Sequence, residues 1–162
     1  MRDPKGDLKY MFKDLCCDSA YTFLQLILLM VAKNNYYWTE KEKELDFIAN
    51  GETAIVRRVR RTTEMYGFRF ADVLLSFPDR QDVELETRLL LDTLHSDAPA
   101  LSREDNERLF QSVLEDYADV PLKKERMKKM KADSYYKALH VKYGYAVTCH
   151  KAQGGQWKNV FL

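Results

Sequence analysis

Residues 145–162 read YAVTCHKAQGGQWKNVFL, and the rest of the chain is best interpreted outward from them. Residues 145–149 are short, apolar and β-prone, which predicts a buried strand. Residues 150–155 are polar and end in two glycines, which predicts a turn, and residues 157–162 are apolar again. A strand that feeds a polar segment is how α/β folds place ligand-contacting groups at the carboxyl ends of their strands.

The polar part of this stretch carries several hydrogen-bond donors. Thr148, His150 and Lys151 offer donors for phosphate oxygens, and Gln153 offers an amide that can read a base or a nucleotide. The stretch resembles motif V of superfamily 1 helicases, in the RecD-like branch, where a small apolar strand precedes Thr-x-His-Lys-(Ser/Ala)-Gln-Gly. The matching residues are Thr148, His150, Lys151, Ala152, Gln153 and Gly154.

A second segment upstream resembles the same family. Residues 33–36 read KNNY and residues 47–52 read FIANGE, which look like the RecD-like "Asn-Asn-Tyr … Asn-Gly-Asp/Glu" segment. The two landmarks occur in the family's order. The resemblance covers residues 28–51 and 145–162 well, and between them only the order of elements agrees.

The resemblance implies roles for particular residues. Thr148, His150 and Lys151 would contact single-stranded DNA, as would Asn34 and Asn35. The nucleotide cleft would be lined by Gln153, Gly154 and Gln156, although the family often has glutamate at the last of these positions.

The residues alone also allow plainer interpretations of these sites. His150 and Gln153 could cap a helix that begins there. Asn34 and Asn35 could form a turn, because asparagine tolerates left-handed backbone and bonds locally. Tyr36, Tyr37 and Trp38 could stack on bases or belong to the core.

The parts needed for ATP hydrolysis are mostly absent from the sequence. A phosphate loop needs a Gly-Lys pair, and the chain contains none. It also lacks an Asp-Glu pair for magnesium, and the family's arginine finger lies downstream of motif V. We therefore expect no catalytic residue and no metal site here. The chain would be a fragment whose full-length parent binds ATP and magnesium.

Composition excludes some classes of protein. The chain has 162 residues, 31% of them charged, with a net charge of +1, which suits one domain, or one and a small insert. Its 3 cysteines show no metal-ligand or disulfide spacing, which fits a reduced cytoplasmic compartment. The apolar run at 24–32 is too short to cross a bilayer, so no membrane association is expected.

Basic residues cluster in two segments that could contact nucleic acid or form solvated faces. The first contains Arg57, Arg58, Arg60, Arg61 and Arg69. The second is rich in lysine and contains Lys123, Lys124, Arg126, Lys128, Lys129, Lys131, Lys137 and Lys142.

Periodicity predicts a buried strand at 24–32, a turn at Asn50-Gly51, and strands at 53–61, 66–77 and 83–91. The apolar phase shifts within 66–77, which suggests a bulge or bend, and short bent strands suggest a small barrel. A capped helix is predicted at 102–117, and a second helix from about Pro121 to about 139.

These elements lead to a mixed α+β fold. The resemblance divides it into a partial second RecA-like helicase domain, residues 1–50 and 140–162, and an inserted Src-homology-3-like barrel at 51–139 whose helical segment is 102–139. The missing N-terminal RecA-like domain would be a partner. A truncated sheet would expose strand edges, which predicts self-association.

Three functions remain open from the sequence. The chain could be a piece of an ATP-dependent RecD-like DNA helicase or exonuclease subunit that holds single-stranded DNA and couples it to ATP. It could be a stand-alone module that binds nucleic acid or protein. It could also be a structural or decayed protein in which the motif is inert.

Overall fold

Five strands form a closed barrel in this computed structural model, which describes residues 27–40, 46–96, 98 and 100–145. The strands are β1 (Leu28–Val31), β2 (Thr53–Met65), β3 (Phe68–Phe77), β4 (Val83–Leu90) and β5 (Leu139–Tyr143). Neighbours pair antiparallel except β4 and β5, which are parallel, and β1 closes the barrel by pairing with β2 and β5. The predicted mixed α+β fold with a small barrel is confirmed.

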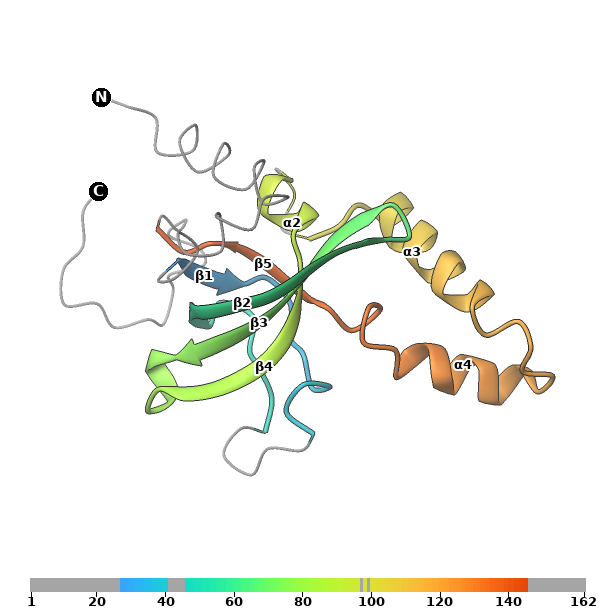
Figure 1. Ribbon diagram of the computed structural model, residues 1–162, viewed down its shortest axis with the longest axis horizontal. Coiled ribbons are helices and arrows are strands. Elements are labelled where there is room, and N and C mark those ends of the chain that lie inside the picture. Colours follow the sequence, from blue (N-terminus) through green and yellow to red (C-terminus); the bar gives the residue numbers. More distant parts are fainter. Residues whose placement is uncertain (1–26, 41–45, 97, 99, 146–162) are drawn as a thin grey trace.

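The parallel pairing of β4 and β5 explains the helices. Parallel neighbours need a long crossover connection, and three helices lie within it: α2 (Asp92–His95), α3 (Arg103–Glu115) and α4 (Lys123–Lys131). Figure 1 shows α3 and α4 side by side, projecting from one end of the barrel. A short 3-10 helix, η2 (Pro78–Arg80), joins β3 to β4.

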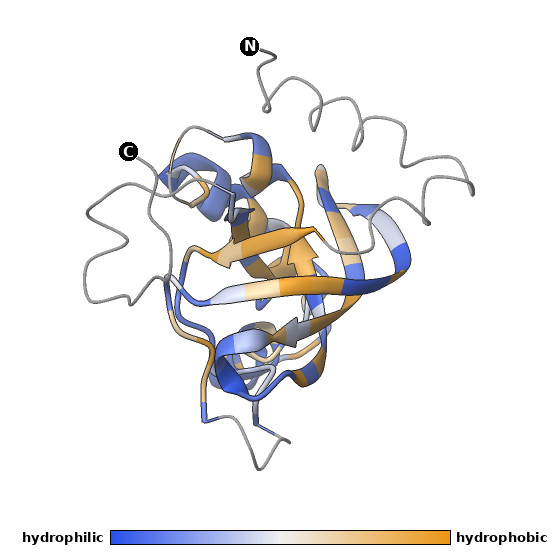
Figure 2. Ribbon diagram, turned by 90° about the vertical axis from the view of Figure 1, so that its left-hand side faces the viewer, coloured by the Kyte–Doolittle hydropathy of each residue, from blue (hydrophilic) through white to orange (hydrophobic). Residues whose placement is uncertain are grey.

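The hydrophobic residues form two cores, and Figure 2 shows how strongly they concentrate on the strands. The barrel interior holds the first core, which includes Leu29, Val56, Val73, Leu75, Phe77, Leu89 and Val141. The second core lies where α3 and α4 pack on the outside of the barrel, and it includes Phe68, Phe70, Leu90, Leu109, Val113 and Met130.

Strand β3 contributes to both cores, and this explains its shift of apolar phase. Phe68 and Phe70 face the helices, whereas Val73, Leu75 and Phe77 face the barrel interior. Successive strand residues point to opposite faces of the sheet. The apolar residues therefore shift from even to odd positions where the buried face of β3 changes from the helix side to the barrel interior. Of the predicted bulge or bend in this strand, the bulge is wrong: each register shift adds a residue to β2, between Val56 and Arg58 and between Val59 and Arg61.

One turn follows its sequence signal, and a second turn replaces the start of the strand that was predicted at 66–77. Gly51, in the predicted Asn-Gly turn, has φ 89° and its N–H donates to the carbonyl of Val31 at 2.8 Å. Tyr66 and Gly67 form the two-residue loop between β2 and β3, with φ 58° and 73°. Positive φ at both central residues matches the twist of a tight hairpin.

The first predicted helix is confirmed at its start. The Ser102 hydroxyl accepts a hydrogen bond from the Asp105 N–H at 3.0 Å, as an N-cap should, and α3 begins at Arg103.

The second predicted helix is too long in the sequence interpretation. It ends at Lys131 because the Asp133 carboxylate accepts hydrogen bonds from the N–H groups of Tyr135 and Tyr136, at 2.7 and 3.2 Å, which forms a local turn in place of further helix. The two tyrosines then pack against the second core.

Strand β5 was not predicted. It occupies Leu139–Tyr143 and begins where the second predicted helix was expected to end. Gly144 follows it and lies so close to β1 that an added Cβ would come within 2.9 Å of Leu28 Cγ and 3.2 Å of the Leu29 backbone. A side chain at this position would therefore disturb the closure of the barrel.

The barrel also extends beyond the residues 51–139 proposed for it. Strands β1 and β5 belong to segments assigned from the sequence to the partial RecA-like domain, and here they pair with β2 and β4. Each of the five described strands has a neighbour on both sides. The open strand edge expected to drive self-association is therefore not found among them.

Candidate nucleic-acid interface

The motif V residues lie outside the described residues. These are Thr148, His150, Lys151, Gln153, Gly154 and Gln156. Of the predicted site residues, the structure describes Asn34 and Asn35, which follow β1 in the loop that leads to β2.

The side chain of Asn35 organises this loop. Its Oδ1 accepts from the N–H groups of Tyr37 and Trp38 at 3.0 and 3.4 Å, and its Nδ2 donates to the carbonyl of Lys137 at 2.9 Å. Its backbone forms an isolated antiparallel bridge with Ile48. These bonds match the turn interpretation of Asn35.

Asn34 is placed differently. Its Oδ1 accepts from the N–H of Asn50 at 2.7 Å, which ties the two parts of the upstream landmark together. The residue is exposed, and its Nδ2 has no hydrogen-bond partner within the described part of the chain. Asn34 therefore combines a structural bond with a donor that faces solvent.

The neighbouring aromatic residues differ in exposure: Tyr36 is exposed and Trp38 is partly buried. Tyr36 is 61% exposed, and its ring stacks on Phe47 with centroids 5.2 Å apart. Trp38 packs against the barrel core and donates from Nε1 to the carbonyl of Lys137 at 2.8 Å. Tyr36, supported from behind by Phe47, is thus the ring of this loop that presents the larger free surface for stacking on a base.

The arginine cluster on β2 is partly neutralised. Arg60 pairs with Glu86, and Arg57 lies 3.7 Å from Asp82. Arg58 and Arg61 are exposed and have no hydrogen bond or ion pair among the described residues. Two arginines of this strand therefore remain as free positive charges on the outside of the barrel.

Helix α4 carries the largest concentration of positive charge. Five of its nine residues are exposed lysines, and Glu125 is its acidic residue. From the sequence, this segment was identified as rich in lysine, but the positions of the lysines on the helix were not predicted.

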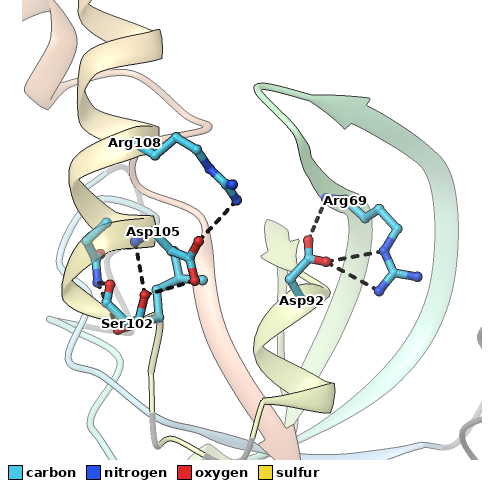
Figure 3. A network of polar contacts seen from close by, with 7 residues as sticks. Arg69, Asp92, Ser102, Asp105 and Arg108 are labelled. Atoms are coloured by element: carbon cyan, nitrogen blue, oxygen red, sulfur yellow. Dashed lines mark hydrogen bonds and ion pairs between the residues drawn. The ribbon is translucent and has the colours of Figure 1, made fainter.

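A polar hollow lies between the β2–β3 turn, α2 and the start of α3. Figure 3 shows its two carboxylates. Asp92 accepts from the Arg69 backbone N–H at 2.6 Å and from its guanidinium at 3.3 Å, and Asp105 contacts Arg108 at 3.1 Å and the Ser102 hydroxyl at 2.9 Å. Both acids are already paired, so the hollow offers no spare charge for a ligand.

His140 is a buried titratable residue on β5. It is 7% exposed, and its Nδ1 has no hydrogen-bond partner in the described region. Burial and, to a smaller extent, the positive charges of Lys33 and Lys142 together lower the pKa of His140 to about 4. The ring is therefore neutral at neutral pH, which suits a structural position beside Leu90.

The described residues contain no cluster of three or more His, Cys, Asp or Glu side chains that could hold a metal ion. Among the helices that the structure describes, none has the length and apolar character needed to span a membrane.

No protein-family model matches the chain, and no curated protein matches it.

Proposed function

We propose that this chain is part of a RecD-like superfamily 1 DNA helicase or exonuclease subunit, in which it contacts single-stranded DNA and couples that contact to ATP. Thr148, His150 and Lys151 would bind the DNA backbone, with Asn34 beside them. Gln153, Gly154 and Gln156 would face ATP and magnesium held largely by the N-terminal RecA-like domain of the parent protein.

One observation carries the proposal. Of the two segments that resemble the family, residues 33–52 connect β1 to β2 and residues 145–162 follow β5, so four of the five barrel strands and the helical excursion lie between them in the sequence. A small barrel of the Src-homology-3 type, inserted after the Asn-Gly turn, is the arrangement that the resemblance implies. Because the strand pattern and the motifs are independent features of the sequence, their agreement supports the family more than either does alone.

The first landmark also has geometry that suits a strand of DNA. Asn34 keeps a free amide donor and Tyr36 an exposed ring, and both lie in the loop directly after β1. A donor for phosphate oxygens beside a stacking surface is the combination that single-strand binding sites use.

The proposal is tested by the affinity of the chain for a fluorescent single-stranded oligonucleotide, measured by anisotropy at low salt. We expect His150→Ala to weaken binding about tenfold, because a tenfold change corresponds to about 1.4 kcal/mol, the size of one charge-assisted hydrogen bond. The matched control is His95→Ala, which removes an exposed histidine from α2. Equal affinity for the two variants would contradict a DNA contact in motif V.

A second function is favoured by one feature of the barrel. Its sheet is closed and encloses a hydrophobic core, which are the features of a domain that folds independently. A stand-alone nucleic-acid or protein binding module is the alternative, and DNA binding that ignores His150 would favour it.

A further inference from the structure

Three lysines of α4 form a straight row on one side of the helix. Lys124, Lys128 and Lys131 are spaced i, i+4 and i+7, which places them on one face. At about 1.5 Å of rise per residue, the row is about 10 Å long. Met130 lies in the second core, and Met127, which follows Lys124 by three residues and so lies beside the row, packs against that core.

None of these lysines is neutralised by its surroundings. All three are exposed and form no hydrogen bond or ion pair in the part of the chain that the structure describes. The neighbouring helix α3 is acidic, yet no ion pair joins α3 to α4, both of which are fully described. Glu125, the acidic residue of α4, precedes Lys128 by three residues and also forms no ion pair with any of the three lysines, all of which are described.

The helix is also held firmly at both ends. Before it, the Arg126 guanidinium donates to the carbonyls of Ala118 and Val120 at 3.0 and 2.9 Å. After it, the Asp133 carboxylate accepts from the Tyr117 hydroxyl at 2.8 Å.

The barrel adds a further anchor just beyond the helix. The Arg88 guanidinium donates to Ser134 at 2.7 Å, lies 3.9 Å from the centroid of the Tyr135 ring and binds Asp72 on β3. The row is thus fixed in orientation relative to β4, which reduces the entropy lost when an extended partner binds along it.

The repulsion between the lysines destabilises the helix, and binding of a polyanion would relieve this repulsion. Like charges at i, i+4, such as Lys124 and Lys128, destabilise a helix by about 0.2–0.5 kcal/mol per pair. A phosphate backbone offsets such repulsion when it binds and needs no apolar anchor. A protein interface usually has aromatic or apolar residues at its centre, whereas the apolar residue beside this row, Met127, packs against the second core.

A membrane surface fits less well. An interfacial helix buries a continuous apolar face in the bilayer. The methionines of α4 are occupied by the second core, and the exposed apolar side chain nearby is Leu122, at the N-cap.

We propose that Lys124, Lys128 and Lys131 bind phosphates of the single-stranded nucleic acid, forming a second contact separate from motif V. The identity of the partner rests on the proposed function. The contact itself rests on the geometry of α4.

The test compares two variants that each remove three positive charges. The first is Lys124→Gln/Lys128→Gln/Lys131→Gln. The control is Arg103→Gln/Lys123→Gln/Lys129→Gln, whose three residues are exposed and lie off the row. Glutamine has nearly the helix propensity of lysine, and circular dichroism with a melting curve checks that both variants fold.

Single-strand affinity is measured from about 50 to about 200 mM salt. Each phosphate contact contributes about 0.7 to the slope of log affinity against log salt. The row variant lacks three contacts, so its slope should be smaller by about 2. Over this roughly fourfold change in salt, the affinity of the native chain should therefore drop about twentyfold more than the affinity of the row variant. The control should keep the native slope.

Several outcomes would overturn the inference. Equal slope losses in the row variant and the control would mean diffuse charge attraction. Tighter row-dependent binding to poly-glutamate, or to vesicles of anionic lipid, than to DNA at the same salt would identify another partner. If the row variant keeps the native slope while His150→Ala binds DNA more weakly than the native chain, the lysine row is not a contact and the proposed function stands. If the row variant loses slope while His150→Ala binds DNA as tightly as the native chain, the lysine row is a contact and motif V is not.

Discussion

At the scale of single residues, His140 links the packing of the barrel to pH. Its pKa is about 4 in the folded chain because of burial and the nearby lysines, whereas an unperturbed histidine has a pKa of about 6.5. Between these values the unfolded chain binds a proton that the folded chain does not. The free energy of unfolding should therefore fall as pH falls from about 6.5 to about 4, by a total on the order of 3 kcal/mol.

Substituting His140 by leucine tests this directly. Leucine has no proton to bind and fills a similar apolar volume, so His140→Leu should lose less stability than the native chain between pH 7 and pH 5, by about 2 kcal/mol. Urea unfolding at the two pH values measures the difference, with His95→Leu as the control on an exposed histidine. The same pH dependence in native chain and His140→Leu would show that the folded ring titrates normally.

The site residues also differ in how well the sequence predicts their roles. The turn interpretation of Asn35 rests on the tendency of asparagine side chains to accept hydrogen bonds from nearby backbone N–H groups. The structure shows such bonds from Tyr37 and Trp38. The link from Arg88 to Asp72, Ser134 and Tyr135 could not be predicted, because it joins positions 16 and 46 residues apart. No local pattern encodes a contact of that range.

At the scale of elements, β3 separates two packing environments. Phe70 lies in the second core, where its ring meets Tyr135 edge-on with centroids 5.0 Å apart, and Leu75 lies in the barrel interior. Since α3 and α4 pack on the second core, weakening it should loosen these two helices before the barrel opens.

Phe70→Leu tests this separation. We expect hydrogen exchange to speed up at the amides of α3 and α4 while the amides of β2 and β4 keep their native rates. Leu75→Val, the matched change on the other face, should speed up exchange in the strands as well. Uniform acceleration in both variants would mean that barrel and helices unfold as one unit.

Elements with strong local signals are well predicted, and those set by tertiary pairing are not. Strands β2, β3 and β4, the start of α3 and the Asn-Gly turn follow from alternation, an N-cap serine and turn residues. Strand β5 is not predicted because its segment is short and of mixed polarity, and its β structure comes from pairing with β1 and β4. The second predicted helix is too long because residues 132–139 include alanine, lysine and leucine, which favour helix, whereas the hydrogen bonds to Asp133 form a turn there.

At the scale of the whole molecule, the barrel and the helices present positive charge in two places. Arg58 and Arg61 lie free on the outside of β2, and the lysine row lies on α4. The net charge of the chain is only +1, because acidic residues elsewhere balance them. The distribution of charge, and not its sum, supports contact with nucleic acid.

The central claim is that this chain binds single-stranded DNA. The most direct test is the anisotropy of a labelled single-stranded oligonucleotide titrated with the native chain of 162 residues, from about 50 to about 200 mM salt. The account predicts saturable binding at the lower salt, with an affinity that falls linearly in log–log form as salt rises. An unchanged anisotropy at about 50 mM salt, up to high protein concentration, would contradict it.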